Sequence, residues 1–255
     1  METRNRLLLS LSREELKAIK PYITSVALKN SAVVHELGAP IEHVYFMESG
    51  IVSLMNMTAG RLIETATAGR NGAAGGIVAL ETVNSAHHSI VLIGGRASRI
   101  TTTDLLRLMA DGHSIRSRLL QNAVAVLMHA SQTALCATRH ELTQRLSCWL
   151  ATTFDALDGG AVAITHERLA DILGLRRAGL TEALTKLETD GILRKSRGLL
   201  HVHAPDKLKQ RACHCYRIIA NAYRCEHQPR SFDSASEEIR MRDHTRGTID
   251  PHGLY

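Results

Sequence analysis

The sequence lacks long runs of apolar residues. No uninterrupted stretch approaches the roughly 18 residues that a helix needs to cross a bilayer. The opening METRNR, followed by a short apolar patch, does not have the pattern of a secretory signal. We therefore expect a cytoplasmic chain without a membrane partner.

Cysteines are few and scattered. The five cysteines include no CxxC pair, which argues against a disulfide scaffold and against a four-thiolate zinc or iron–sulfur site. Cys213 and Cys215 flank His214, and thiolate and imidazole are good zinc ligands. Residues two apart on a helix point to different faces, however, so we predict a half-buried helix here and no metal site. Cys136 and Cys148 are interpreted as small apolar fillers of the core.

Recognisable catalytic groups are also missing. No nucleophile–base pair and no metal-ligand spacing stands out, which argues against an enzyme. The chain has 255 residues, of which 44% are hydrophobic, and this is enough for two modest domains. The formal net charge of +6 and the isoelectric point near 9.2 favour a polyanionic partner such as nucleic acid.

Residues 165–193, THERLADILGLRRAGLTEALTKLETDGIL, predict two short helices joined by a turn at Gly174. Thr165 is a suitable N-cap for the first helix, and the second helix has no such cap. Each helix has an apolar face, formed by Leu169, Ile172 and Leu173 in the first and by Leu180, Leu184 and Leu187 in the second. A helical hairpin that merely closes a domain would show similar faces. Small Ala170, the glycine turn and two arginines at the second helix favour DNA recognition instead.

Several polar side chains in this region could reach phosphates and base edges. Residues 191–203 predict two short strands around Arg197 and Gly198, with Ile192, Leu200 and Val202 buried. These strands would form the wing of a winged helix, whose basic residues contact the DNA backbone. The predicted DNA-binding residues are Thr165, His166, Arg176, Arg177, Thr181, Glu182, Lys186, Lys195 and Arg197.

Residues 1 to about 110 are rich in strand-like segments. Residues 7–23 predict a helix or a helix pair, with Ser12 as an N-cap and Pro21 near the end. The segments that follow predict a small antiparallel barrel or roll, and they span residues 26–37, 43–58, 62–68 and 88–100.

A glycine-rich stretch, residues 68–88, interrupts these strands and predicts a passage from strand to short helix and back. Bends of this kind expose backbone N–H groups that can cradle a phosphate, although glycines also serve tight turns in any barrel. The candidate effector pocket comprises Gly69, Asn71, Gly72, His88 and Ser89.

Residues 114–135 predict one long helix. Leucine or alanine recurs every seven residues at Leu120, Leu127 and Ala134, with Val124 and Ser131 between them. This seam could pair with an identical helix in a homodimer, or it could pack on the chain's own barrel. A further helix is expected over residues 139–157, closed by the Asp-Gly-Gly that follows, and a domain boundary is expected near Thr138.

The order of roll, glycine-rich bend, long helix and helix pair resembles the Crp/Fnr family of bacterial transcription factors over roughly residues 5–225. The likeness is most specific in the helix pair and is supported by PIEHVYFMESGIVSL, residues 40–54, with its turn at Gly50. By that resemblance Arg177 takes the place of the main base-reading arginine, and Ala178 and Glu182 stand where other members carry further specificity residues. RNA polymerase is an implied partner.

The resemblance also implies the domain organisation. We expect an α+β chain with an antiparallel β-roll like that of cyclic-nucleotide-binding domains (1–112), a dimerisation helix (113–138) and a winged helix-turn-helix (139–209). A C-terminal helix and a disordered tail are expected at 210–255.

The effector site departs from the family pattern. Members that bind cyclic nucleotides carry Gly-Glu and Arg-Ser or Arg-Thr pairs, whereas here residues 69–72 lack the acid and His88 stands in place of the arginine. A neutral imidazole cannot form the bidentate clamp of a guanidinium, although a protonated His88 could pair with an anion. The N-terminal cysteine cluster of oxygen-sensing members is absent, and no cofactor is predicted.

These features predict a homodimeric, sequence-specific DNA-binding transcription regulator. Its barrel either senses an unknown effector other than cyclic AMP or is filled by its own side chains and binds no ligand. The alternative is a nucleotide-sensing module that does not bind DNA and acts on a protein partner.

Overall fold

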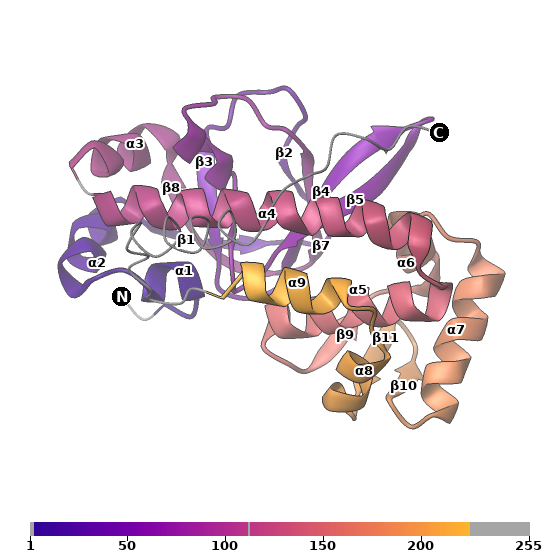
Figure 1. The fold of residues 1–255 in the computed structure, drawn as a ribbon. Helices are drawn as coiled ribbons and strands as arrows, with labels where there is room; N and C mark the ends of the chain where they lie inside the picture. Colours follow the sequence, from indigo (N-terminus) through magenta and orange to yellow (C-terminus); the bar gives the residue numbers. More distant parts are fainter. Residues whose placement is uncertain (1–2, 112, 225–255) are drawn as a thin grey trace, which may run out of the picture. The chain divides into compact units, whose positions relative to one another are not determined.

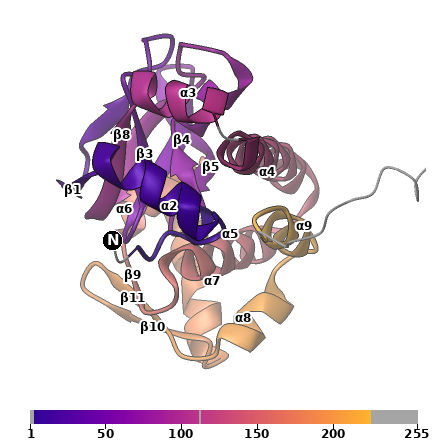
Figure 2. The same cartoon turned by 90° about the vertical axis from the view of Figure 1, so that its left-hand side faces the viewer.

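The computed structural model describes residues 3–111 and 113–224 (Figures 1 and 2). Its N-terminal half contains two four-stranded antiparallel sheets, in the orders β1-β8-β3-β6 and β2-β7-β4-β5. The strands are β1 (Thr24–Leu28), β2 (Val33–His35), β3 (His43–Met47), β4 (Ile51–Thr58), β5 (Arg61–Ala68), β6 (Ala73–Ala74), β7 (His88–Ile93) and β8 (Gly95–Thr101). The predicted antiparallel roll is confirmed.

Glycines mark most of the points where the chain passes from one sheet to the other. The predicted strand 43–58 is divided at Gly50, whose φ is +77°, into β3 of one sheet and β4 of the other. A Cβ on Gly50 would overlap the carbonyl oxygen of Ile93, and one on Gly95 would overlap that of Ser49. Only glycine allows this close approach of two backbones. The predicted strand 88–100 is divided in the same way at Gly94, whereas 26–37 is divided without a glycine, at a turn in which Ser31 has a φ of +65°.

The N-terminal segment is a helix pair, as predicted. It consists of α1 (Arg6–Leu9), α2 (Arg13–Ile19) and a 3₁₀ turn, η1 (Lys20–Tyr22), which contains Pro21. Ser12 forms a capping box with Glu15 at the start of α2. The two reciprocal bonds satisfy two backbone donors that a helix end leaves free, so the local sequence defines this start.

One short helix lies within the roll, and two longer helices connect the roll to the C-terminal region. A 3₁₀ helix, η2 (Gly76–Leu80), follows the glycine-rich bend, as the sequence predicted. The sequence did not predict α3 (Thr102–Asp111), which buries Leu105 and Met109 four residues apart. The long helix α4 (His113–Arg139) exceeds the predicted 114–135 and runs along one side of the roll (Figures 1 and 2). None of the helices in the described ranges is long and apolar enough to cross a membrane.

The C-terminal region contains α5 (Leu142–Leu157), β9 (Ala161–Ala163), α6 (His166–Leu173), α7 (Arg177–Thr189), β10 (Leu193–Ser196), β11 (Leu199–Val202), α8 (Pro205–Arg211) and α9 (Cys215–Ala222). Helix α5 ends at Asp158 (φ +65°), followed by two glycines with positive φ, as predicted. Strand β9 joins the wing in the order β10-β11-β9. Helix α9 packs beside α4 (Figures 1 and 2). The predicted disordered tail lies outside the described residues.

The roll and the C-terminal region share one apolar core, which includes Met55 and Ile93 of the roll as well as Leu150 and Leu184. A buried polar contact lies beside it. The indole Nε1 of Trp149 donates to Glu64 Oε1 at 2.6 Å, and the hydroxyl of Ser53 donates to the other carboxylate oxygen. Burial raises the pKa of Glu64 to about 7, although both hydrogen bonds and the nearby Arg168 favour the ionised form.

Candidate DNA-binding surface

The helix pair α6–α7 begins and turns where the sequence predicts. Thr165 Oγ1 accepts a hydrogen bond from the backbone N–H of Arg168 at 3.2 Å, which caps α6. Gly174 ends α6 in the left-handed conformation, with φ +62°. Arg176 occupies the N-cap of α7 and makes no side-chain capping bond within the described residues.

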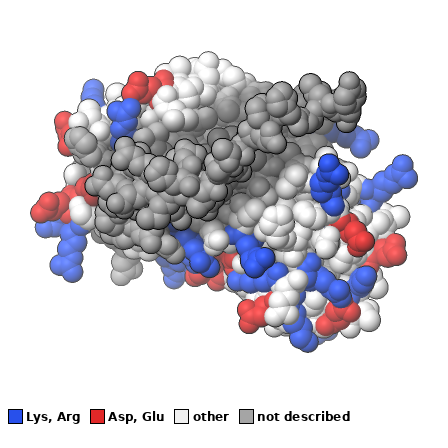
Figure 3. Space-filling view, in the orientation of Figure 1, with Lys and Arg blue, Asp and Glu red and all other residues white. Residues whose placement is uncertain are grey.

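The apolar faces of both helices are buried, as predicted. Leu169, Ile172, Leu180, Leu184 and Leu187 are fully buried and belong to the shared core. Leu173 is half-buried. The remaining face of α7 therefore meets solvent, and its exposed side chains are Arg177, Ala178, Thr181, Glu182, Thr185, Lys186 and Thr189. Basic and acidic side chains are mixed on the surface formed by α7, α8 and the wing (Figure 3).

Arg177, the first residue of α7, is an exposed candidate for reading a base. Its side chain is 70% exposed, and Nη1 lies 3.7 Å from Glu167 Oε1 of α6. An exposed ion pair of this kind contributes little free energy, so the guanidinium can exchange it for another acceptor. Arg176 and Thr165 are also exposed, and His166 is half-buried at the start of α6.

A groove borders this helix pair. Its volume is about 1080 Å³, and the residues that line it come from the β4–β5 hairpin and from α6 with its following turn, Arg176 included. A Cβ on Gly174 would lie 3.3 Å from Ile63 Cδ1 of the hairpin. The roll therefore touches the turn of the helix pair.

The wing has the predicted two strands around Gly198, whose φ is +72°. Arg197 is exposed at the tip. The side chain of Lys195 instead folds against α7, with Nζ 3.0 Å from Glu188 Oε2 and 2.9 Å from Thr185 Oγ1. Arg194, which was not among the DNA-binding residues predicted from the sequence, is exposed on the opposite side of β10. Successive side chains of a strand point to opposite faces, so Lys195 lies on the same face as buried Leu193 and Arg194 lies on the other face. The sequence could therefore have indicated that Arg194 is the more exposed of the two.

The predicted dimer seam on α4 is largely uncovered. Val124 is 54% and Leu127 is 65% exposed, Ser131 is exposed and Leu120 is half-buried. Met128 and Leu135 extend the same apolar stripe. The opposite face of α4 packs on the chain through Leu119, Asn122, Ala125, His129 and Cys136. A free apolar stripe of this length on a helix favours a protein partner.

The candidate effector residues form two separate groups. Ala68, which precedes Gly69, pairs with Val52, whereas Ser89 and His88 pair with Leu54 and Met55. The two groups are therefore offset by roughly 7 to 10 Å along β4. His88 Nδ1 lies 3.0 Å from a carboxylate oxygen of Glu36. Ser89 is buried. No hydrogen bond joins the two groups in the part of the chain that the structure describes.

The glycine-rich bend is filled by the chain itself. A Cβ on Gly72 would lie 2.9 Å from Asn122 Nδ2 of α4, and the carbonyl of Gly72 accepts a bond from Asn5 Nδ2 at 2.8 Å. The backbone N–H of Arg70 donates to Ala156 at 2.9 Å, and that of Gly72 donates to Gly69 at 3.0 Å. These N–H groups are therefore already engaged. Asn71 flanks the bend, and its buried Oδ1 has no hydrogen-bond partner among the described residues.

Comparison with known proteins agrees with this geometry. Residues 144–211 match the model of the Crp-like helix-turn-helix domain. FixK2 from Bradyrhizobium japonicum superimposes with a TM-score of 0.64 and 18% sequence identity, covering 75% of this chain and 98% of that one. The c-di-GMP-responsive global regulator CLP from Xanthomonas campestris gives a TM-score of 0.58, 16% identity and coverage of 75% and 99%. A Crp/Fnr-family transcriptional regulator from Thermus thermophilus gives a TM-score of 0.55 and 18% identity, covering 74% of this chain and 98% of that one. No curated protein sequence matches the chain.

The roll, the long helix and the winged helix pair are thus arranged as in the solved regulators. Residues 144–211 match a Crp-like helix-turn-helix domain, and the chain that carries them has the fold seen in Crp/Fnr transcription regulators.

Proposed function

We propose that this chain is a sequence-specific DNA-binding transcription regulator that acts as a homodimer. The observation that carries the proposal is the exposed polar face of α7, which begins at Arg177 and lies within a Crp-like helix-turn-helix domain. A second helix of this kind enters the major groove with its N-terminal residues on base edges.

Each side chain of the surface has a role in this proposal. Arg177 reads a guanine through its two parallel donors, while Thr181 and Glu182 contact neighbouring base edges. The groups at the start of α6 and the wing arginines contact phosphates, which supplies affinity that does not depend on sequence. Lys186 on the same face adds to this attraction.

The uncovered stripe on α4 provides the dimer contact. Pairing of Val124 and Leu127 with a second copy would bury apolar surface that the monomer exposes. The resulting two-fold axis would place the two copies of α7 in successive major grooves, roughly 34 Å apart. The operator is therefore two-fold symmetric, and RNA polymerase is the partner that binding there would affect.

We propose further that the roll does not bind cyclic AMP as an effector. The side chain of Asn122 lies against the glycine-rich bend, and that of Asn5 donates a hydrogen bond to it. His88 is paired with Glu36, away from that bend. These contacts support a degenerate nucleotide site.

Selection of bound duplexes from a random DNA pool tests the proposal. The wild-type chain should enrich a two-fold symmetric motif, and Arg177→Ala should lose roughly 1 to 3 kcal/mol on that motif at fixed salt. Arg217→Ala, which removes the same charge from an exposed position on α9, is the matched control and should bind as the wild type does. Failure to enrich any motif would remove DNA recognition and favour a module that acts on a protein partner.

A further inference from the structure

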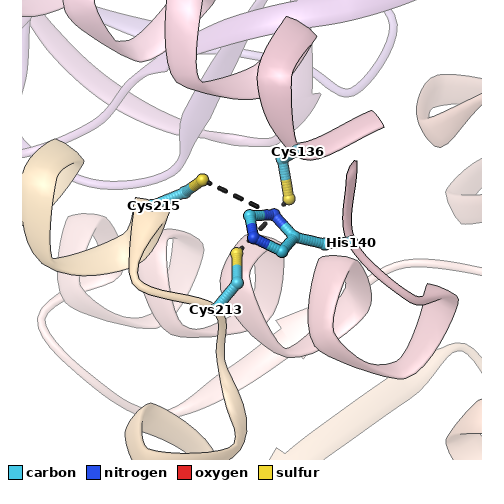
Figure 4. Close-up of side chains that lie close together, drawn as sticks. All are labelled: Cys136, His140, Cys213 and Cys215. Atoms are coloured by element: carbon cyan, nitrogen blue, oxygen red, sulfur yellow. Dashed lines mark hydrogen bonds between the residues drawn. The ribbon is translucent and has the colours of Figure 1, made fainter. Parts of the chain in front are cut away.

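Two segments that are far apart in the sequence bring four metal-binding side chains together (Figure 4). Cys136 lies on the last turn of α4, and His140 follows the end of that helix. The backbone N–H of His140 donates to the carbonyl of Cys136 at 3.2 Å, so the helical turn continues to His140. Residues four apart on such a turn share one face, and both side chains point toward the α8–α9 connection.

The other two residues come from that connection. Cys215 is the first residue of α9, whereas Cys213 precedes the helix, in the link after α8. The rule that residues two apart on a helix diverge therefore does not apply to this pair. Both thiols point toward Cys136 and His140 (Figure 4), and the exposed His214 between them does not belong to the group.

The distances suit a single small ion. The Sγ atoms of Cys136 and Cys213 are 3.4 Å apart, and Cys215 Sγ lies 3.7 Å from His140 Nδ1. All four donor atoms lie within 4.8 Å of one another. A zinc ion with Zn–S bonds of about 2.3 Å holds tetrahedral sulfur ligands about 3.8 Å apart. Small side-chain rotations would therefore convert the cluster into a zinc shell.

We propose that Cys136, His140, Cys213 and Cys215 form a structural zinc site. Three thiolates and one imidazole are a ligand set that selects zinc over harder cations such as magnesium. Four protein ligands close the coordination shell, so the site holds structure and leaves no open position for a reacting water. Binding releases the three thiol protons to solvent and couples metal affinity to folding.

The site would fasten the segment that follows the wing to the long helix. Helix α9 already contacts α4 and the roll at its far end, where the hydroxyl of Tyr223 bonds the carbonyl of Thr67 at 3.3 Å and lies 3.3 Å from His129 Nδ1. Zinc would fix the near end. Because helix α9 packs against both α4 and α5, the ion would stiffen the junction between the long helix and the helix-turn-helix domain.

Metal analysis of the full-length chain tests the site. Protein purified from zinc-supplied culture and desalted should contain about one zinc per chain. After chelation, titration with cobalt(II) should give the visible d–d bands of a tetrahedral site together with thiolate charge-transfer bands. Cys136→Ser and Cys213→Ser should each lose the zinc and these bands.

Two neighbours serve as matched controls. Cys148→Ala removes a thiol of α5 that adjoins the thiols of Cys136 and Cys213 but lies outside the set of four. His214→Gln removes an imidazole between the two C-terminal thiols. Both variants should retain the zinc and the cobalt spectrum. Circular dichroism verifies that each variant is folded. If a variant is not folded, the cobalt titration of the wild-type chain still tests whether the tetrahedral metal site exists.

A wild-type chain that purifies without zinc and gives no tetrahedral cobalt spectrum would overturn the proposal. So would a disulfide between Cys136 and Cys213 in the freshly purified chain, detected by peptide mass under non-reducing conditions. Retention of zinc by Cys136→Ser or Cys213→Ser, or its loss from Cys148→Ala, would overturn the ligand assignment.

Discussion

At the scale of single residues, the most unusual group is the carboxyl of Glu64. It is buried in β5, where it accepts hydrogen bonds from Ser53 and Trp149 and interacts electrostatically with Arg168 and Tyr223. Desolvation outweighs the two hydrogen bonds, which is why the pKa rises from 4.5 to about 7. The group therefore binds a proton more tightly in the folded chain than in the unfolded chain.

This shift makes stability depend on pH. A raised pKa stabilises the folded state below the unfolded value of 4.5, and the contribution is lost as the pH rises through about 7. The loss is on the order of 3 kcal/mol for a fully buried group. Glu64→Gln cannot ionise, so its free energy of unfolding in urea should fall less than that of the wild type between about pH 5 and pH 8.

Glu14→Gln, on the exposed side of α2, is the control and should follow the wild-type curve. Parallel curves for Glu64→Gln and the wild type would show that the Glu64 carboxyl does not titrate in this range.

At the scale of elements, the wing separates two roles for its basic residues. Arg194→Ala and Arg197→Ala remove exposed charges, so each should weaken binding to every DNA sequence alike and reduce the salt slope by about one. Lys195→Ala breaks the contacts with Glu188 and Thr185, so it should lower the melting temperature and leave the salt slope nearly unchanged. Binding titrations at several salt concentrations distinguish these outcomes, and a reduced slope for Lys195→Ala would assign it to phosphate contact.

The long helix provides a test of the dimer. Because Leu127 is 65% exposed, Leu127→Glu should leave each chain folded, yet in a dimer it would bury two unpaired carboxylates. Sedimentation should therefore show a monomer, and operator affinity should collapse with it. Met57→Glu, an equally exposed apolar position on β4, should remain dimeric. A dimer of Leu127→Glu would move the interface elsewhere.

The sequence predicted elements that local chemistry defines. The Thr165 cap, the Ser12–Glu15 capping box and the turn at Gly174 depend on residues within a few positions of each other. It did not predict where strands change sheets, because strand-forming residues stand on both sides of Gly50 in the sequence while the chain leaves one sheet for the other. Helix α3 was missed because its apolar residues follow a long β-rich stretch.

At the scale of the whole molecule, contacts between remote segments escaped prediction. Asn122 fills the glycine-rich bend from α4, and Cys136 meets Cys213 across 77 positions of sequence. Residue spacing within one segment cannot predict either contact, because each contact joins two remote segments. The order of roll, long helix and winged helix pair was predicted because each has its own local pattern and the resemblance supplied their succession.

The filled bend has a measurable outcome. Calorimetric titration of the chain with cyclic AMP and cyclic GMP at neutral pH should detect no micromolar binding, since Asn122 lies against Gly72 and no arginine clamp faces a phosphate from the position of His88. Enrichment of an operator by the same preparation shows that it is active. Micromolar binding of either nucleotide would restore an ordinary nucleotide sensor.

The hydrogen bond between Trp149 and Glu64 gives the chain an optical probe. Trp149 is the single tryptophan of the sequence, and it is buried where the helix-turn-helix domain meets the roll. If operator or effector separates these parts, water will reach the indole and its fluorescence will shift to longer wavelength. Emission that stays unchanged at saturating operator will show that roll and helix pair engage DNA as one body. Every binding titration of the wild-type chain can therefore report, without a label, whether the ligand separates the roll from the helix-turn-helix domain.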